Sequence, residues 1–313
     1  GGRGLEGRLD AALATAGVKT LASGRLAMGF ARLSGGRTSV IIDAASPPAG
    51  VAGLRAHAST LAFELTSGRR PLIVSCGSGA PFGHDWHRAG RATASHSTLS
   101  IEGYSSSRLA VGPNEVLADR ACVTTAHHIA GGRHAGPEVL TGTVRAGAVQ
   151  AAAAEGSGMV LAQDGWAETH GLMHSRTLWL AADGRRLTGQ EALMAATPQQ
   201  RLRFDAVMTR TRLQGLRYAL RFHLHPDVDA EIDLGGTAVS LALKSGEIWV
   251  FRHETGPALS LDPSVYLEKG RLRPRATKQI ILSGTLQDFE ARIGWTLAKA
   301  QDTPLAIRDT ETG

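Results

Sequence analysis

The chain has 313 residues, of which 42% are hydrophobic and 20% are charged, and its formal net charge at pH 7 is +6. This length and composition are those of a globular protein with a sizeable core, which excludes disordered and fibrous classes. No apolar run approaches the roughly 20 residues that a membrane-spanning helix needs, so we expect no membrane span. Two cysteines, Cys76 and Cys122, are too few for a disulfide framework.

The pattern of apolar residues changes once along the chain. Residues 5–16 carry apolar side chains at spacings of three and four, as in one amphipathic helix. From about residue 25 the period becomes two, which is typical of β-strands. The clearest alternating runs are residues 38–42, 61–65, 99–101, 178–180, 218–224 and 239–243.

Turn-forming residues separate these runs and favour a β-sandwich. Asp183-Gly184, Gly235-Gly236 and the Lys244–Glu247 segment supply the positive φ angles that tight turns need. We therefore predict an all-β fold, a large antiparallel β-sandwich over about residues 25–300. Weaker helical patterns occur at residues 190–196 and 286–300, and the second pattern fits a final strand equally well.

The excess of positive charge favours an anionic partner, although it is also compatible with an ordinary solvated basic surface. The Lys and Arg residues are dispersed between strand-like runs, and no helix-turn-helix, zinc-finger or aromatic RNA-binding signature occurs. An acidic polysaccharide is therefore favoured over nucleic acid. Glycine-rich phosphate loops, nucleophile elbows and zincin helices are also absent from the sequence.

Three segments in the first third of the chain carry a family resemblance. Residues 57–65 read HASTLAFEL, residues 70–77 read RPLIVSCG, and residues 91–99 read RATASHSTL. In order and spacing they resemble the C-terminal β-sandwich domain of the heparinase II and III family of polysaccharide lyases. The resemblance is close over residues 54–103 and extends over the rest as a general β pattern.

The resemblance implies a domain organisation and a place in the cell. In that family a supersandwich-like domain packs against an N-terminal α/α toroid. We therefore expect residues 1–22 to be a helical remnant of an upstream toroid and residues 23–313 to be the sandwich domain. The resemblance also implies a bacterial protein of the periplasm or cell envelope.

The same resemblance implies a metal site, because some relatives hold a metal with a His, an Asp and a His from the three segments. The matching residues here are His57, Ser75 and His96. Serine is a poor zinc ligand, whereas the neighbouring Cys76 offers a thiolate, so we predict zinc at His57, Cys76 and His96. An alternative is that the two histidines are buried, hydrogen-bonded structural residues.

Other residues are candidates for contact with a sugar chain. Arg91 is expected to face the acidic substrate, and Trp86, in a predicted loop, could stack on a sugar ring or belong to the core. Arg221 and His223 belong to a predicted basic row with Arg217 and His225 on one sheet face. This row could line a groove for acidic sugars or simply face solvent.

The activity that the resemblance implies is β-elimination in a uronic-acid polymer. Such a lyase neutralises the C6 carboxylate, removes the C5 proton and protonates the departing oxygen. We predict that His96 and His57 organise the site and that His87 takes part in proton transfer. Because the toroid is missing, we expect little catalysis from this chain alone. The alternative is a catalytically degenerate glycan-binding or structural domain.

Overall fold

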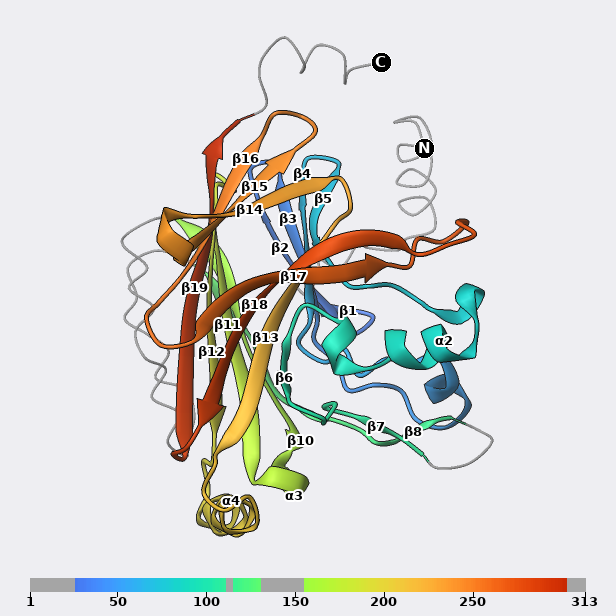
Figure 1. Ribbon diagram of the computed structural model, residues 1–313, viewed down its shortest axis with the longest axis vertical. Helices are drawn as coiled ribbons and strands as arrows, with labels where there is room; N and C mark the ends of the chain where they lie inside the picture. Colours follow the sequence, from blue (N-terminus) through green and yellow to red (C-terminus); the bar gives the residue numbers. More distant parts are fainter. Residues whose placement is uncertain (1–25, 111–114, 131–154, 303–313) are drawn as a thin grey trace, which may run out of the picture.

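The computed structural model describes residues 26–110, 115–130 and 155–302, and within them two antiparallel sheets face each other (Figure 1). The first sheet has the order β1-β2-β3-β4-β5-β13-β18-β17, with β6 paired to β13. Its strands are β1 Leu26–Ala27, β2 Phe30–Gly35, β3 Thr38–Asp43, β4 Phe63–Ser67, β5 Arg70–Val74, β6 Leu99–Ile101, β13 Leu216–Leu224, β17 Ala258–Tyr266 and β18 Arg275–Leu286.

The second sheet has the order β14-β15-β16-β19-β12-β11-β10-β9. Its strands are β9 Val123–Ala130, β10 Gly156–Trp166, β11 Leu172–Ala181, β12 Arg186–Met194, β14 Val228–Asp233, β15 Ala238–Leu243, β16 Ile248–His253 and β19 Glu290–Gln301. A small separate ribbon pairs β7, Arg108–Leu109, with β8, Leu117–Asp119. These sheets confirm the predicted all-β sandwich, whereas the predicted helix at residues 5–16 and the boundary at residue 22 lie outside the described residues.

Aromatic side chains fill the space between the two sheets. Phe63 of the first sheet stacks on Trp295 of the second, with ring centroids 5.6 Å apart. Phe222 packs edge-on against Trp295 at 4.9 Å and tilts against Phe251 at 4.8 Å. The indole of Trp295 lies directly against the backbone of Gly189, because a Cβ atom there would stand 2.1 Å from the ring. This stack joins the two sheets.

The predicted turns are confirmed, whereas the helix predictions need correction. Gly184, Gly236 and Gly246 have positive φ angles between successive antiparallel strands. Residues 190–196 are not helical, because Gln190 to Met194 belong to β12. For residues 286–300 the strand alternative is confirmed, because β19 spans Glu290–Gln301. The sequence reading missed α4, Pro198–Arg210, which Thr197 caps by a reciprocal hydrogen-bonded box with Gln200.

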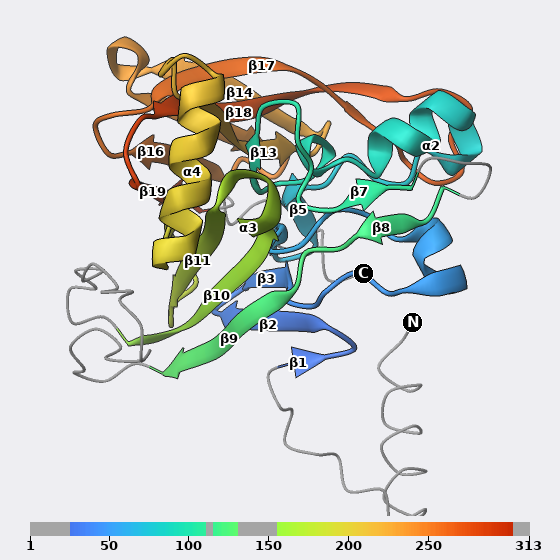
Figure 2. The same ribbon diagram turned by 90° about the horizontal axis from the view of Figure 1, so that it is seen from below.

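The helices lie outside the two sheets, and two of the predicted site residues, Trp86 and His87, lie on α2. In both views α2 projects from one side of the sandwich, and α3 and α4 lie at one end in Figure 1 (Figures 1 and 2). The helices are η1 Gly50–Arg55, η2 Ala80–Phe82, α2 His84–Gly90, η3 Thr93–Ser95, α3 Ala167–His170, α4 Pro198–Arg210 and η4 Leu234–Gly236. No helix of the described residues is long and apolar enough to cross a membrane.

Candidate functional site

The candidate site is centred on two imidazole rings, which belong to two different connections between strands. His57 follows η1 and His96 follows η3, and His57 Nδ1 lies 3.2 Å from His96 Nε2. His96 is 4% exposed, and burial lowers its pKa from 6.5 to about 3. His57 is half-buried, and burial lowers its pKa as well. Both rings are therefore neutral at pH 7, and one of them donates to the other.

The surroundings indicate which ring donates. His96 Nδ1 is buried and has no hydrogen-bond partner among the described residues. A buried N–H without an acceptor is costlier and rarer than a buried lone pair without a donor. We infer from this network that His96 Nε2–H donates to His57 Nδ1, and that His57 keeps its own proton on Nε2. His57 therefore carries its proton on Nε2, and the backbone of Gly90 lies within hydrogen-bonding reach of its ring.

A buried charge network holds the segment that carries His96. Arg176 on β11 donates from Nη1 to the Ser97 carbonyl at 3.0 Å and also to the Leu61 carbonyl. Its Nε donates to Glu191 Oε1 at 2.8 Å, and Glu191 also accepts from Trp295 Nε1 at 3.2 Å. Both charged side chains are fully buried. The second sheet therefore fixes the backbone next to His96 and the segment that follows His57.

Two hollows meet beside the histidine pair. The histidine hollow, of about 740 Å³, is lined by His57 and His96 together with Asp43 and Glu64. Asp43 accepts from Ser59 at 2.6 Å, and Glu64 accepts from the Ser75 amide at 3.1 Å. Burial raises the pKa of the Asp43 carboxyl. The apolar part of this lining includes the exposed side chains Met28, Phe30 and Ile41.

The basic hollow, of about 560 Å³, shares Ser78 with the histidine hollow and is formed by η1 and α2. Arg55, His84 and His87 line it, and Glu115 is its one acidic side chain. His84 lies 3.4 Å from Glu115, whereas no described residue pairs with the exposed guanidinium of Arg55. The Nδ1 atom of His87 is buried without a partner among the described residues. This hollow therefore suits an anionic group.

Arg91 has a different position from the one expected. The residue is 1% exposed, and its guanidinium donates to the carbonyls of Ala56, Glu115 and Gly53 at 2.8, 2.7 and 2.8 Å. All three acceptors belong to the backbone, so the side chain ties the η1 connection to the end of α2. Arg91 builds the wall of the basic hollow instead of facing a substrate with its charge.

Cys76 does not join the histidine pair as the predicted zinc ligand. Its Sγ lies 3.5 Å from His223 Nδ1 and 3.9 Å from Ser264 Oγ, and burial raises the pKa of its thiol. Throughout residues 26–110, 115–130 and 155–302, no three His, Cys, Asp or Glu side chains gather as a group that could hold a metal. Two imidazoles beside Ser75 do not fit the zinc site that the resemblance implies.

The predicted basic row on β13 divides into two parts. His223 is buried, donates from Nε2 to the Ala94 carbonyl at 2.9 Å, and has a pKa lowered by burial to about 4. It is a neutral structural residue beneath η3. Arg217 and Arg221 instead line a separate hollow on the outer face of the sheet. Trp86 lies on α2 with 37% of its surface exposed, outside the core.

The sequence reading missed two sets of residues. Arg55 was not a candidate, although its position at the end of a turn two residues before His57 places it beside any ligand of that histidine. The buried pair of Arg176 and Glu191 was also missed, because charged strand residues usually face solvent and the sequence does not show which residue pairs with them. Both faces of β11 and β12 carry polar residues about equally, and this pattern was the available indication that some of them are buried.

Comparison with known proteins assigns the whole sandwich to one kind of domain. The family described as Heparinase II/III-like, C-terminal, matches residues 20–296. FtsZ-localized protein C of Caulobacter vibrioides is 29% identical over 166 residues, which are 53% of this chain and 27% of that protein. The chain thus spans about a quarter of that relative's length.

Solved structures agree at the level of the fold. Heparan sulfate lyase HepC from Pedobacter heparinus superposes with a TM-score of 0.59 and 13% identity, over 94% of this chain and 39% of that one. The heparinase III-BT4657 gene product gives 0.60 and 11%, over 90% of this chain and 36% of that one. The chain therefore corresponds to little more than a third of each lyase.

Proposed function

Because the chain belongs to the heparinase II/III-like C-terminal family, we propose that it binds an acidic, uronic-acid-containing polysaccharide as the sandwich half of a lyase-type cleft. The observation that carries the proposal is the basic hollow next to the histidine pair. Arg55 there is exposed and unpaired among the described residues, and His87 lies beside it. A guanidinium binds a carboxylate in a two-pronged, charge-assisted contact. His57 then donates to the adjoining sugar.

The histidine pair supports substrate positioning better than proton removal. β-Elimination needs a base for the C5 proton, but the inferred tautomer leaves His57 without a free lone pair, because Nε2 carries the proton and Nδ1 accepts from His96. His96, with a pKa of about 3, stays neutral and only orients its neighbour. Proton removal then falls to His87 or to a group outside this chain. A protein that binds without cleaving is the second candidate, and the same tautomer favours it.

The apolar rim of the histidine hollow is consistent with a cleft completed by another domain. Met28 is 98% exposed, and Phe30 and Ile41 next to it are also exposed. Exposed apolar side chains that line a hollow together mark a surface that a second body covers. An upstream toroid of the same protein, as in the lyases with this fold, would lie here and supply the missing catalytic groups.

The test is binding of oligogalacturonate and heparan sulfate oligosaccharides, measured by titration calorimetry at low salt. We expect Arg55→Ala to weaken binding about tenfold, as for loss of a charged hydrogen-bonded partner. Arg252→Ala is the matched control, because it removes the same charge from an exposed position on β16 of the second sheet. Equal effects of the two substitutions, or no binding by the unaltered chain, would contradict the proposal.

Cleavage is a separate readout of the same experiment. The unsaturated product of β-elimination absorbs in the ultraviolet, so binding and cleavage are measured on the same samples. Binding without absorbance change is expected of this chain. Strong absorbance would show that the chain itself holds the base, and His87→Gln would then identify or exclude His87.

A further inference from the structure

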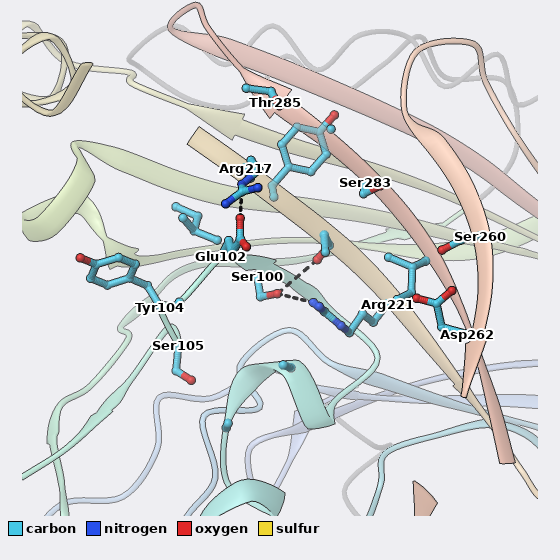
Figure 3. A pocket seen from close by; sticks show the side chains of 18 residues that line it. Ser100, Glu102, Tyr104, Ser105, Arg217, Arg221, Ser260, Asp262, Ser283 and Thr285 are labelled. Carbon is cyan, nitrogen blue, oxygen red and sulfur yellow. Dashed lines mark hydrogen bonds and ion pairs between the residues drawn. The ribbon is translucent and has the colours of Figure 1, made fainter. Parts of the chain in front are cut away.

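A third hollow lies on the outer face of the first sheet and belongs to neither part of the proposed cleft (Figure 3). It has a volume of about 630 Å³ and extends across β6, β13, β18 and β17. Ala92 and Ala94 are among its lining residues. None of the residues that line this outer hollow also lines the histidine hollow.

The strand register explains why the sheet is hollowed here. Ala219 pairs with Ser100 on one side and with Ser283 on the other, so three small side chains form a row across the strands. The row on one side contains the larger Arg217 and Thr285, and the row on the other contains Arg221 and Ile281. Paired residues point to the same face of a sheet. The three small residues therefore form the floor of the hollow, and the larger side chains in the rows on either side form its walls.

The walls carry equal numbers of opposite charges. Arg221 Nη1 donates to Ser100 Oγ at 2.7 Å, and Arg217 forms an ion pair with Glu102. Asp262 on β17 lines the same hollow beside Arg221, and its charge acts on that guanidinium (Figure 3). Two guanidinium groups and two carboxylates therefore face one space, which has no net charge.

The remaining polar groups of the lining are hydroxyls. They belong to Ser100, Tyr104, Ser105, Ser260, Ser283 and Thr285. Arg side chains only donate hydrogen bonds, carboxylates only accept them, and hydroxyls do both. This mixture matches a ligand that itself consists of hydroxyl groups, each of which is donor and acceptor. An anionic ligand would be repelled by the two carboxylates as well as attracted by the two guanidinium groups. It therefore has no electrostatic advantage over a neutral ligand.

We propose that the outer hollow binds a neutral oligosaccharide, independently of the acidic polysaccharide proposed for the histidine and basic hollows. Its volume lies within the roughly 300–1,000 Å³ typical of small-molecule sites. Tyr104 at its rim adds an aromatic ring whose position is set by an edge contact with His170, with centroids 4.5 Å apart. The ligand class follows from the balanced charges and the hydroxyl lining.

The test titrates the chain with cellotriose, maltotriose and triacetylchitotriose, using ligand-observed NMR to detect weak binding. At least one of the three trisaccharides is expected to bind in the millimolar range. Ser283→Tyr fills the floor of the hollow and is expected to weaken that binding about tenfold or more. Ala276→Tyr places the same ring at an exposed position of the same strand, outside the hollow, and is expected to leave binding unchanged.

Each other outcome overturns the proposal. Failure of all three trisaccharides to bind would show that the hollow does not recognise neutral sugars. Equal binding by the unaltered chain and the Ser283→Tyr variant would place the sugar elsewhere. A third result would be that oligogalacturonate competes with the neutral trisaccharide for binding to the unaltered chain but not to the Arg55→Ala variant. That result would assign the neutral sugar to the proposed acidic cleft instead. Circular dichroism and thermal melting of each variant establish that it is folded.

Discussion

Neutralising Glu191 tests whether the buried charge network holds the sandwich and its site together. Glu191 accepts from Arg176 Nε at 2.8 Å and from His174 Nε2 at 2.7 Å, and all three side chains are fully buried. Glu191→Gln keeps the shape and one acceptor oxygen but leaves the Arg176 guanidinium without a counter-charge. Breaking a buried ion pair in this way costs about 3–5 kcal/mol.

That cost is large compared with the stability of a domain, which is about 5–15 kcal/mol. Urea unfolding followed by tryptophan fluorescence measures it, because Trp295 donates to Glu191 and reports on this part of the core. Arg176→Met removes the other charge. The double variant removes both charges together. We therefore expect its loss of unfolding free energy to be smaller than the sum of the losses in the two single variants.

The cycle of variants isolates the interaction between the two charges. A coupling free energy of about 1–3 kcal/mol is expected for residues in direct contact. Additive losses would refute the reasoning, because they would mean that Arg176 and Glu191 stabilise the fold separately. Oligogalacturonate binding by Arg176→Met should also fall, since Arg176 fixes the Ser97 carbonyl beside His96.

Four further measurements follow from the structure. His96 and His223 have folded pKa values of about 3 and about 4, below the value of 6.5 for an unfolded histidine. The unfolded state therefore binds more protons, and the free energy of unfolding should fall as the pH drops from about 6.5 toward 4. A His223→Gln variant whose stability falls just as steeply with pH would contradict this assignment. Gly189→Ala should destabilise the chain by about 2 kcal/mol or more in urea unfolding, because its Cβ would overlap the Trp295 ring, and an unchanged unfolding midpoint would mean that the stack has room. Elemental analysis should find less than one zinc per chain, unchanged by His96→Ala; one equivalent that this substitution removes would show that the pair binds metal. Finally, His57→Gln should keep oligogalacturonate binding and His57→Leu should lose it, since glutamine also donates a hydrogen bond; equal loss in both would argue against the inferred tautomer.

The sandwich could be predicted from the sequence because its physical cause is local. Alternating apolar residues, as in residues 218–224, fix which face of a strand is buried, and glycines such as Gly184 fix the turns. The helix α4 was missed because few of its residues are apolar, and Leu202 among them is exposed. Its capping residues Thr197 and Gln200 were the available signal.

The site was only partly predictable because side-chain partners depend on tertiary structure. The three family segments did bring His57 and His96 together, since both precede strands of one sheet. The sequence could not show that Arg91 points at backbone carbonyls or that Cys76 lies against His223. Neither position is encoded by spacing: both follow from how the connections around α2 fold back on the sheet.

The separation between the aromatic stack and the short helices also bears on how such a protein can change over time. Phe63, Trp295 and Gly189 tolerate few replacements, whereas η1 and α2 lie outside the sheets and contribute little to the core. Substitutions at exposed positions there alter stability by only about 0.5 kcal/mol. New ligand preferences can therefore accumulate on these connections without loss of the fold, a fold that superposes on solved structures with only 11–13% sequence identity.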